Sequence, residues 1–243
     1  MTEPGVDRVA AFPTPQGAED QARRTQLLTT EHWSLLATRS MSWNEAFSRT
    51  GTFLSTLSAG TVSLALAGPA MAFGSAFTLF AVVILSVILF LGVATYVRLV
   101  QVNNEDLYWV YGMNRIRGAY KRMVPGIEHE FITGHTVDAA GFARTFGAIN
   151  VTTEVSALHA LITTPAIVGV IASVVFGIIV GLITAQVVAS EVVAVGAGIA
   201  AAAAGIALML RYGVGEYRKF VARMTSLNDD RDDGDRDRVA ASR

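Results

Sequence analysis

The chain has 243 residues, of which 52% are hydrophobic and only 16% are charged. Soluble domains carry about 25% charged residues, and the deficit here is local: no charge occurs between Arg49 and Arg98, and only Glu191 between Glu154 and Arg211. The net charge of −1 argues against a nucleic-acid partner, whose binding needs a basic face. The absence of cysteine excludes disulfides, thiolate metal sites and cysteine nucleophiles.

Four runs of the chain are long, apolar and free of charge. A bilayer core about 30 Å thick needs roughly 20 apolar helical residues to cross it. Runs of this length lie at 52–73, 76–97, 165–188 and 192–210. Helix breakers or a few polar residues separate the two members of each pair. The sequence therefore predicts an all-α integral membrane protein, with four transmembrane helices in two hairpins and with helical cytoplasmic extensions.

The positive charges are confined to three segments. All 19 Lys and Arg residues fall within 1–50, 98–144 and 211–243, and none falls in the two turns inside the predicted hairpins. Because cytoplasmic loops retain Lys and Arg, we expect both termini and the central segment to lie in the cytoplasm. The first fifty residues hold no apolar stretch typical of a signal peptide, so we expect none to be cleaved.

The expected organisation has six parts. Prolines among small and polar residues predict a disordered tail at the N-terminus, and alternating Asp and Arg predict a disordered end at the C-terminus. Thr136 and Asp138 suit the start of a short helix and Gly147 its end, and a further amphipathic helix is expected at 150–164. The parts are an N-terminal tail (1–20), a cytoplasmic amphipathic helix (21–50), transmembrane hairpin 1 (51–98), a cytoplasmic helical stalk and cap (99–164), transmembrane hairpin 2 (165–212) and a cytoplasmic tail (213–243).

The stalk continues the second span. No break signal occurs before Pro125-Gly126, so we expect one long helix that leaves the bilayer. Residues spaced alternately by four and three form a stripe typical of a coiled-coil seam. We call these residues the stalk seam: Val102, Asp106, Trp109, Met113, Ile116 and Tyr120. The stripe fits a contact between protomers, and it equally fits a core within one chain against the helix at 21–48. Asp106 either fixes register or marks a hydrated part of the seam.

Small residues dominate one face of the third span. Helix association in lipid depends on close backbone approach, and the third and fourth spans present small residues at four-residue intervals. We expect these two helices to pack together, or one of them to pair with a second protomer. The predicted helix-packing residues are Gly169, Ser173, Gly177, Gly181, Gly198 and Ala202.

The first span is rich in hydroxyl groups on one side. Such a face either lines a hydrated path or bonds back to its own helix and to a neighbour. The candidate pore-lining residues are Thr52, Ser55, Thr56 and Ser63. None of the four spans contains Asp, Glu, Lys, Arg or His, which mark most ion-coupled sites, so we expect no coupled pump.

Signals for chemistry are weak. His129 and His135 lie near three acids, but their spacing matches no helical pair of metal ligands. The chain contains no phosphate-binding glycine loop, no nucleophile elbow and no zincin motif. We therefore expect no enzyme activity, no catalytic residues, no cofactor and no metal.

The stretch TTEHWSLLATRSMSWNEAFSRTGTFLSTLSAG, together with RLVQVNNED after the second span, resembles a group of bacterial four-span membrane proteins from high-GC genomes that have no assigned activity. The resemblance covers about the first 125 residues and implies the plasma membrane of a bacterium. By architecture alone, a hairpin flanked by cytoplasmic helices also resembles the SLATT membrane effectors of bacterial conflict systems, which are thought to act as pores.

Two functions remain open from the sequence. The first is a self-assembling, non-enzymatic scaffold or interaction protein in the lipid bilayer, with a cytoplasmic protein as a further partner. The second is a small oligomeric ion channel or membrane-permeabilising effector.

Overall fold

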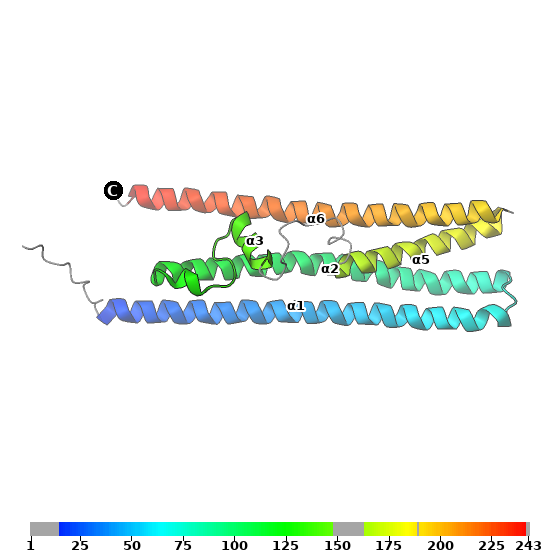
Figure 1. Ribbon diagram of the computed structural model, residues 1–243, viewed down its shortest axis with the longest axis horizontal. Coiled ribbons are helices and arrows are strands. Elements are labelled where there is room, and N and C mark those ends of the chain that lie inside the picture. Colours follow the sequence, from blue (N-terminus) through cyan, green and yellow to red (C-terminus); the bar gives the residue numbers. More distant parts are fainter. Residues whose placement is uncertain (1–14, 148–162, 189, 242–243) are drawn as a thin grey trace, which may run out of the picture. The chain divides into compact units, whose positions relative to one another are not determined.

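The computed structural model describes residues 15–147, 163–188 and 190–241, and these residues form helices and no strands (Figure 1). The elements are α1 (Pro15–Ala70), α2 (Ser75–Met123), the short 3₁₀ helix η1 (Ile127–Glu130), α3 (Ala139–Gly147), α5 (Thr164–Val187) and α6 (Glu191–Ala241). The all-helical class is confirmed for this part of the chain. Residues 1–14 of the expected tail lie outside the described residues. The helix expected at 150–164 also lies outside them, except for its last two residues.

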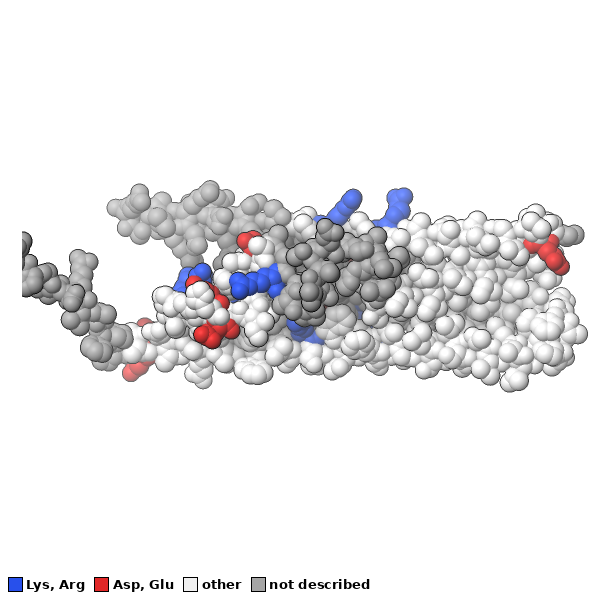
Figure 2. All heavy atoms as spheres, viewed as in Figure 1, with Lys and Arg blue, Asp and Glu red and all other residues white. Residues whose placement is uncertain are grey.

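Four of these helices, α1, α2, α5 and α6, are long and apolar enough to cross a membrane. Figure 2 shows a long stretch of surface without Lys, Arg, Asp or Glu on the face in view. The number of helices with this character therefore agrees with the four apolar runs of the sequence.

The first two long helices join segments that the sequence analysis separated. α1 is continuous through the expected amphipathic helix and the first apolar run. It begins at Pro15, which corrects the expected disorder of residues 15–20; proline is well tolerated at a first helical position because its missing N–H has no partner there. α2 continues without a break to Met123, which confirms the single long helix expected before Pro125-Gly126.

The turn between α1 and α2 depends on one close contact. Ala72 and Phe73 have positive φ values of 50° and 51°, and the backbone N–H of Phe73 donates to the Gly68 carbonyl at 3.0 Å. A methyl group on Gly68 would lie 2.8 Å from the Cζ atom of the Phe73 ring. Glycine at position 68 therefore lets the aromatic ring fold back over the end of α1.

The last helix is longer than expected. α6 starts at Glu191 and continues to Ala241, whereas the sequence analysis predicted that the tail at 213–243 would be disordered at its end. Asp and Arg alternate there, so opposite charges stand three and four positions apart, which favours helix. Extending an existing helix also avoids the cost of nucleation.

The chain divides into two compact units. Unit 1 comprises Met1–Ser40 with Trp109–Val151, and unit 2 comprises Met41–Tyr108 with Thr152–Arg243. α1 and α2 each contribute to both units, so the division cuts through the two helices rather than between the expected parts.

Unit 2 holds the larger apolar core. Phe53 of α1 is 1% exposed, as are Ile88 of α2 and Val168 of α5. A methyl group on Gly60 of α1 would collide with the side chain of Ile88, so the two helices approach closely at this level. Three different helices thus meet in one core, and α6 packs against α5 beside it.

Unit 1 is built around a buried asparagine. Asn114 of α2 is fully buried, and its Nδ2 donates to the carbonyl of Thr136 at 3.1 Å. Its Oδ1 accepts from the Thr145 hydroxyl at 3.2 Å and from Arg117 at 3.1 Å. Asp138 accepts from the backbone N–H of Gly141, three residues on, as a helix-capping residue does. The predicted start of the short helix near Asp138 and its end at Gly147 are confirmed.

Candidate functional site

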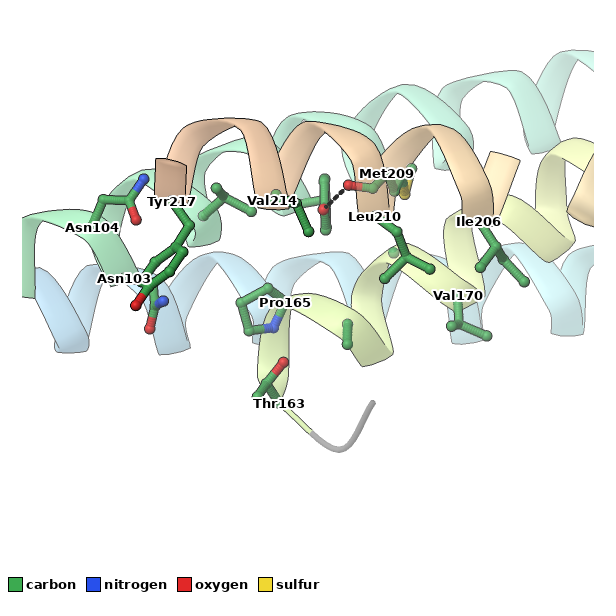
Figure 3. A pocket seen from close by; sticks show the side chains of 15 residues that line it. Asn103, Asn104, Thr163, Pro165, Val170, Ile206, Met209, Leu210, Val214 and Tyr217 are labelled. Atoms are coloured by element: carbon green, nitrogen blue, oxygen red, sulfur yellow. Dashed lines mark hydrogen bonds between the residues drawn. The ribbon is translucent and has the colours of Figure 1, made fainter. Parts of the chain in front are cut away.

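The candidate site of unit 2 is a cavity of about 490 Å³ between α2, α5 and α6 (Figure 3). Asn103, Asn104 and Tyr217 lie at one end of it, and Val170 and Ile206 lie at the other. The volume falls within the range of about 300–1,000 Å³ that is usual for ligand sites. The cavity therefore combines an amide and hydroxyl end with an aliphatic end.

Tyr96 forms the inner wall of this cavity. Its hydroxyl donates to the main-chain carbonyl of Met209 at 2.5 Å, which fixes α2 against α6 (Figure 3). A methyl group on Gly213 would lie 3.1 Å from the Tyr96 hydroxyl, and one on Gly169 would lie 3.1 Å from the Tyr96 ring and the Met209 sulfur. Glycine at positions 169 and 213 therefore leaves room for the phenol.

A second cavity of about 430 Å³ also has Tyr96 and Met209 in its wall. Leu89, Phe176 and Leu208 line it, and its lining is almost wholly apolar. Tyr96 and Met209 thus serve as a common wall of two cavities with different linings.

Charged residues gather where the apolar parts of α1 and α2 end. Arg98 binds Glu45 of α1 through Nη2 and Oε2 at 2.9 Å, and it binds Glu105 through Nη1 at 2.8 Å. Arg49 adds a second cation to Glu45 at 2.8 Å. The hydrogen bonds from Arg98, and then those from Arg49, lower the pKa of Glu45 from 4.5 to about 2. The same acids raise the pKa of Arg98, Glu45 more than Glu105. We call this group the Glu45–Arg98 cluster.

The stalk seam faces the interior of the described chain. Val102, Asp106, Met113 and Ile116 are buried, and Trp109 and Tyr120 are half-buried. The Trp43 indole donates to Asp106 at 3.0 Å in unit 2. In unit 1 the Tyr120 and Thr29 hydroxyls are 3.3 Å apart. Both of these contacts are with α1 of the same chain, as the interpretation of the seam as a core within one chain expects.

The predicted helix-packing residues meet between α5 and α6. A methyl group on Gly177 would lie 2.5 Å from the Gly198 carbonyl oxygen and 2.8 Å from the Ala202 methyl. One on Gly181 would lie 3.8 Å from the Gly198 Cα atom. Ser173 is 1% exposed, and its hydroxyl bonds back to the Gly169 carbonyl at 2.8 Å. The structure thus brings Gly177, Gly181, Gly198 and Ala202 together, while Gly169 faces both Met209 of α6 and Tyr96 of α2.

The predicted pore-lining hydroxyls lie on the outer side of α1. Thr52, Ser55 and Ser63 are exposed, and Thr56 is half-buried. The Thr52, Thr56 and Ser63 hydroxyls donate to carbonyls four residues earlier, at 3.0, 2.9 and 2.8 Å. Of the two interpretations, back-bonding within the helix describes three of the four residues in this chain.

The histidines of unit 1 are not arranged as metal ligands. No group of three His, Asp or Glu side chains within the described ranges is placed to hold a metal ion. His32 and His135 each have a buried Nδ1 atom without a hydrogen-bond partner. Burial, followed by the nearby Arg117, lowers the pKa of His32, which favours the neutral ring.

Sequence reasoning missed two features of unit 2. The sequence did contain a signal for the Glu45–Arg98 cluster. Arg98 is the first charge after the charge-free residues 50–97, and acids lie near both ends of this stretch. The cavity had none, because Tyr96, Asn103 and Tyr217 belong to helices whose register against each other cannot be read from spacing within one helix.

Comparison of the chain with protein-family models, with curated proteins and with solved structures finds no match.

Proposed function

We propose that the chain is a multi-pass protein of the bacterial plasma membrane that assembles with itself and works, without catalysis, as a scaffold or interaction protein. The proposal includes two transmembrane hairpins and cytoplasmic termini. Its location in a bacterial plasma membrane is based on the resemblance of about the first 125 residues to bacterial four-span membrane proteins.

One observation carries the proposal. Within the most apolar 18 residues of each helix, only 6% of the α6 stretch and 17% of the α1 stretch are buried, against 39% for α5. Val192, Ile199 and Leu208 of α6 are each more than 60% exposed. Apolar surface of this extent is not stable in water and needs lipid or another protein to cover it.

The outer side of α1 is the face we assign to self-assembly. Ser55, Ala59 and Ser63 are exposed at four-residue intervals, whereas the bulky Phe53 points into the core. Large apolar side chains satisfy lipid tails, whereas small and hydroxyl-bearing ones favour close approach of another helix. The low burial of the α1 stretch provides the free surface that a second copy would cover.

The experiment uses two differently tagged copies of the chain expressed together. Both copies should stay in membranes washed at alkaline pH, and one tag should recover the other after solubilisation. Ala59→Leu should reduce the recovery of the second copy at least several-fold, because its larger side chain keeps the facing helices apart. Ala65→Leu, at an exposed position on another side of α1, is the control and should leave recovery unchanged. Recovery that is equal for both variants would contradict the assignment of this face.

A small channel or membrane-permeabilising effector is the second candidate. The exposed hydroxyl groups of Thr52, Ser55 and Ser63 favour it, because assembly through this side of α1 would place them near a central axis. The test is ion flux into liposomes that contain purified protein. A discrete conductance altered by Thr56→Leu would support the channel, and absence of flux at every voltage and pH would remove it.

A further inference from the structure

We propose that the 490 Å³ cavity between α2, α5 and α6 binds one glycerolipid from the surrounding bilayer. Its glycerol and ester groups would contact Asn103, Asn104 and Tyr217, and part of one acyl chain would lie along Val170, Ile206 and Leu210. The inference rests on the membrane location proposed above and adds a ligand site to it.

The lining of the cavity is polar at one end and apolar at the other, as a site for a lipid must be. Two amides and the Tyr217 hydroxyl occupy one end, and the side chains of Val170 and Ile206 occupy the other (Figure 3). Amide and hydroxyl groups donate hydrogen bonds to ester oxygens. Aliphatic side chains gain only from covering another apolar surface. A ligand that matches both ends is amphipathic.

At the level of this cavity, α2 and α6 pass between apolar and charged sequence, and α5 begins. On α2, Tyr96 precedes the first charged residue, Arg98, and Asn103 follows it. On α6, Ile206 and Leu210 precede Arg211, and Tyr217 follows it. α5 begins here, with Thr163 and Pro165 in the cavity wall. The cavity therefore spans the boundary between the apolar and the polar parts of the helices, where the glycerol region of a lipid resides.

The length of the cavity fits a flexible chain. From Ile206 to Tyr217 the cavity follows twelve residues of α6, whose ends lie about 16 Å apart at the helical rise. A flexible acyl chain can follow a lining of this length. Leu210 and Val214, at 49% and 50% exposure, leave the side of the cavity open for entry.

None of the described residues that line the cavity is Lys, Arg, Asp or Glu. Recognition would therefore depend on the ester and acyl parts of the lipid rather than on the charge of its headgroup. Retention should then withstand salt, unlike the attraction of anionic lipids to exposed cations, which is screened within about 3 Å at 1 M ionic strength.

The experiment is native mass spectrometry of the full chain released from mixed micelles of phosphatidylethanolamine and phosphatidylglycerol. Ala166→Phe fills the cavity, because Ala166 is part of its wall. Ile167→Phe, at the neighbouring residue that is 48% exposed and outside the wall, is the matched control. We expect one retained lipid of either headgroup on the unaltered chain and on the Ile167→Phe variant, at low and high salt. We expect at least a tenfold loss of that lipid on the Ala166→Phe variant.

A second pair of variants keeps the test valid if Ala166→Phe fails to fold. Asn103→Leu should weaken lipid retention, and Gln101→Leu, an exposed change two residues earlier, should not. An unaltered chain that retains no lipid, or equal retention by the two members of each pair, would overturn the proposal. A dimer in place of a lipid-bound chain, lost on Ala166→Phe, would overturn it in favour of a second copy. If the chain were extracted from membranes at alkaline pH, the membrane location itself would fail; if it stays in the membrane without retained lipid, only the lipid site fails.

Discussion

The indole N–H of Trp43 donates a hydrogen bond of 3.0 Å to the carboxylate of Asp106. Asp106 is 4% exposed and is the single acid of the stalk seam. The one acid of the seam therefore lies opposite a hydrogen-bond donor on α1 of the same chain. A buried acid with a fixed donor also defines the register of α1 against α2, because a slip of either helix would break the bond.

Removal of the donor should destabilise unit 2. We predict that Trp43→Phe lowers the free energy of unfolding by about 1–3 kcal/mol, because a buried carboxylate loses a hydrogen bond. In an Asp106→Leu background the same change should cost much less. Unfolding followed in detergent measures both effects. Trp33→Phe is the control, because Trp33 is 64% exposed on the same helix. If Trp43→Phe lowered the free energy of unfolding equally in the unaltered chain and in the Asp106→Leu chain, the hydrogen bond between Trp43 and Asp106 would not be the cause of the loss.

The contact between α5 and α6 should tolerate no side chain at Gly177. We predict that Gly177→Ile lowers the melting temperature strongly, since its Cβ alone would lie 2.5 Å from the Gly198 carbonyl oxygen; overpacking of this kind costs about 1–3 kcal/mol or more. Gly196→Ile on α6 is the control, because no atom lies within 4 Å of a methyl group built there. Thermal unfolding and detergent chromatography compare the two. Similar behaviour of both variants would contradict the packing.

The helices and their small-residue contacts were the parts that the sequence predicted well. The absence of a break signal before Pro125-Gly126 indicated how far α2 continues, and the proline at position 165 indicated where α5 starts. Four-residue spacing indicated the small faces of α5 and α6, because that spacing is a property of one helix. Spacing did not indicate which helix covers a face. Asp106 against Trp43, and Tyr96 against Met209, each depend on the axial register between two helices, which is set by packing of both.

The Glu45–Arg98 cluster should make stability depend on acid pH. The folded-state pKa of Glu45 is lowered from 4.5 to about 2, so its ionised form stabilises the fold fully above about pH 4.5. This contribution is lost as the pH falls from about 4.5 to 2, where the carboxylate protonates in the folded chain as well. We predict that the difference in melting temperature between the unaltered chain and Glu45→Gln shrinks across this range. Glu31→Gln, an exposed change on α1, is the control. A difference that stays constant with pH would contradict the account.

The proposed topology places both termini in the cytoplasm. The absence of cysteine lets single cysteines report accessibility without background. We predict that Ser190→Cys, in the short connection between α5 and α6, reacts with a membrane-impermeant maleimide on intact cells. Thr133→Cys, between η1 and α3, should react only after the membrane is opened. The reverse pattern would invert the topology.

The mass of the solubilised complex tests the central claim of a self-assembling membrane protein most directly. The protein part of the complex, measured without cross-linking in a mild detergent, should be an integral multiple of 25.8 kDa that is at least two. Ala59→Leu should shift it toward a single chain, and Ala65→Leu should not. A mass of one chain for the unaltered protein at every concentration would contradict self-assembly.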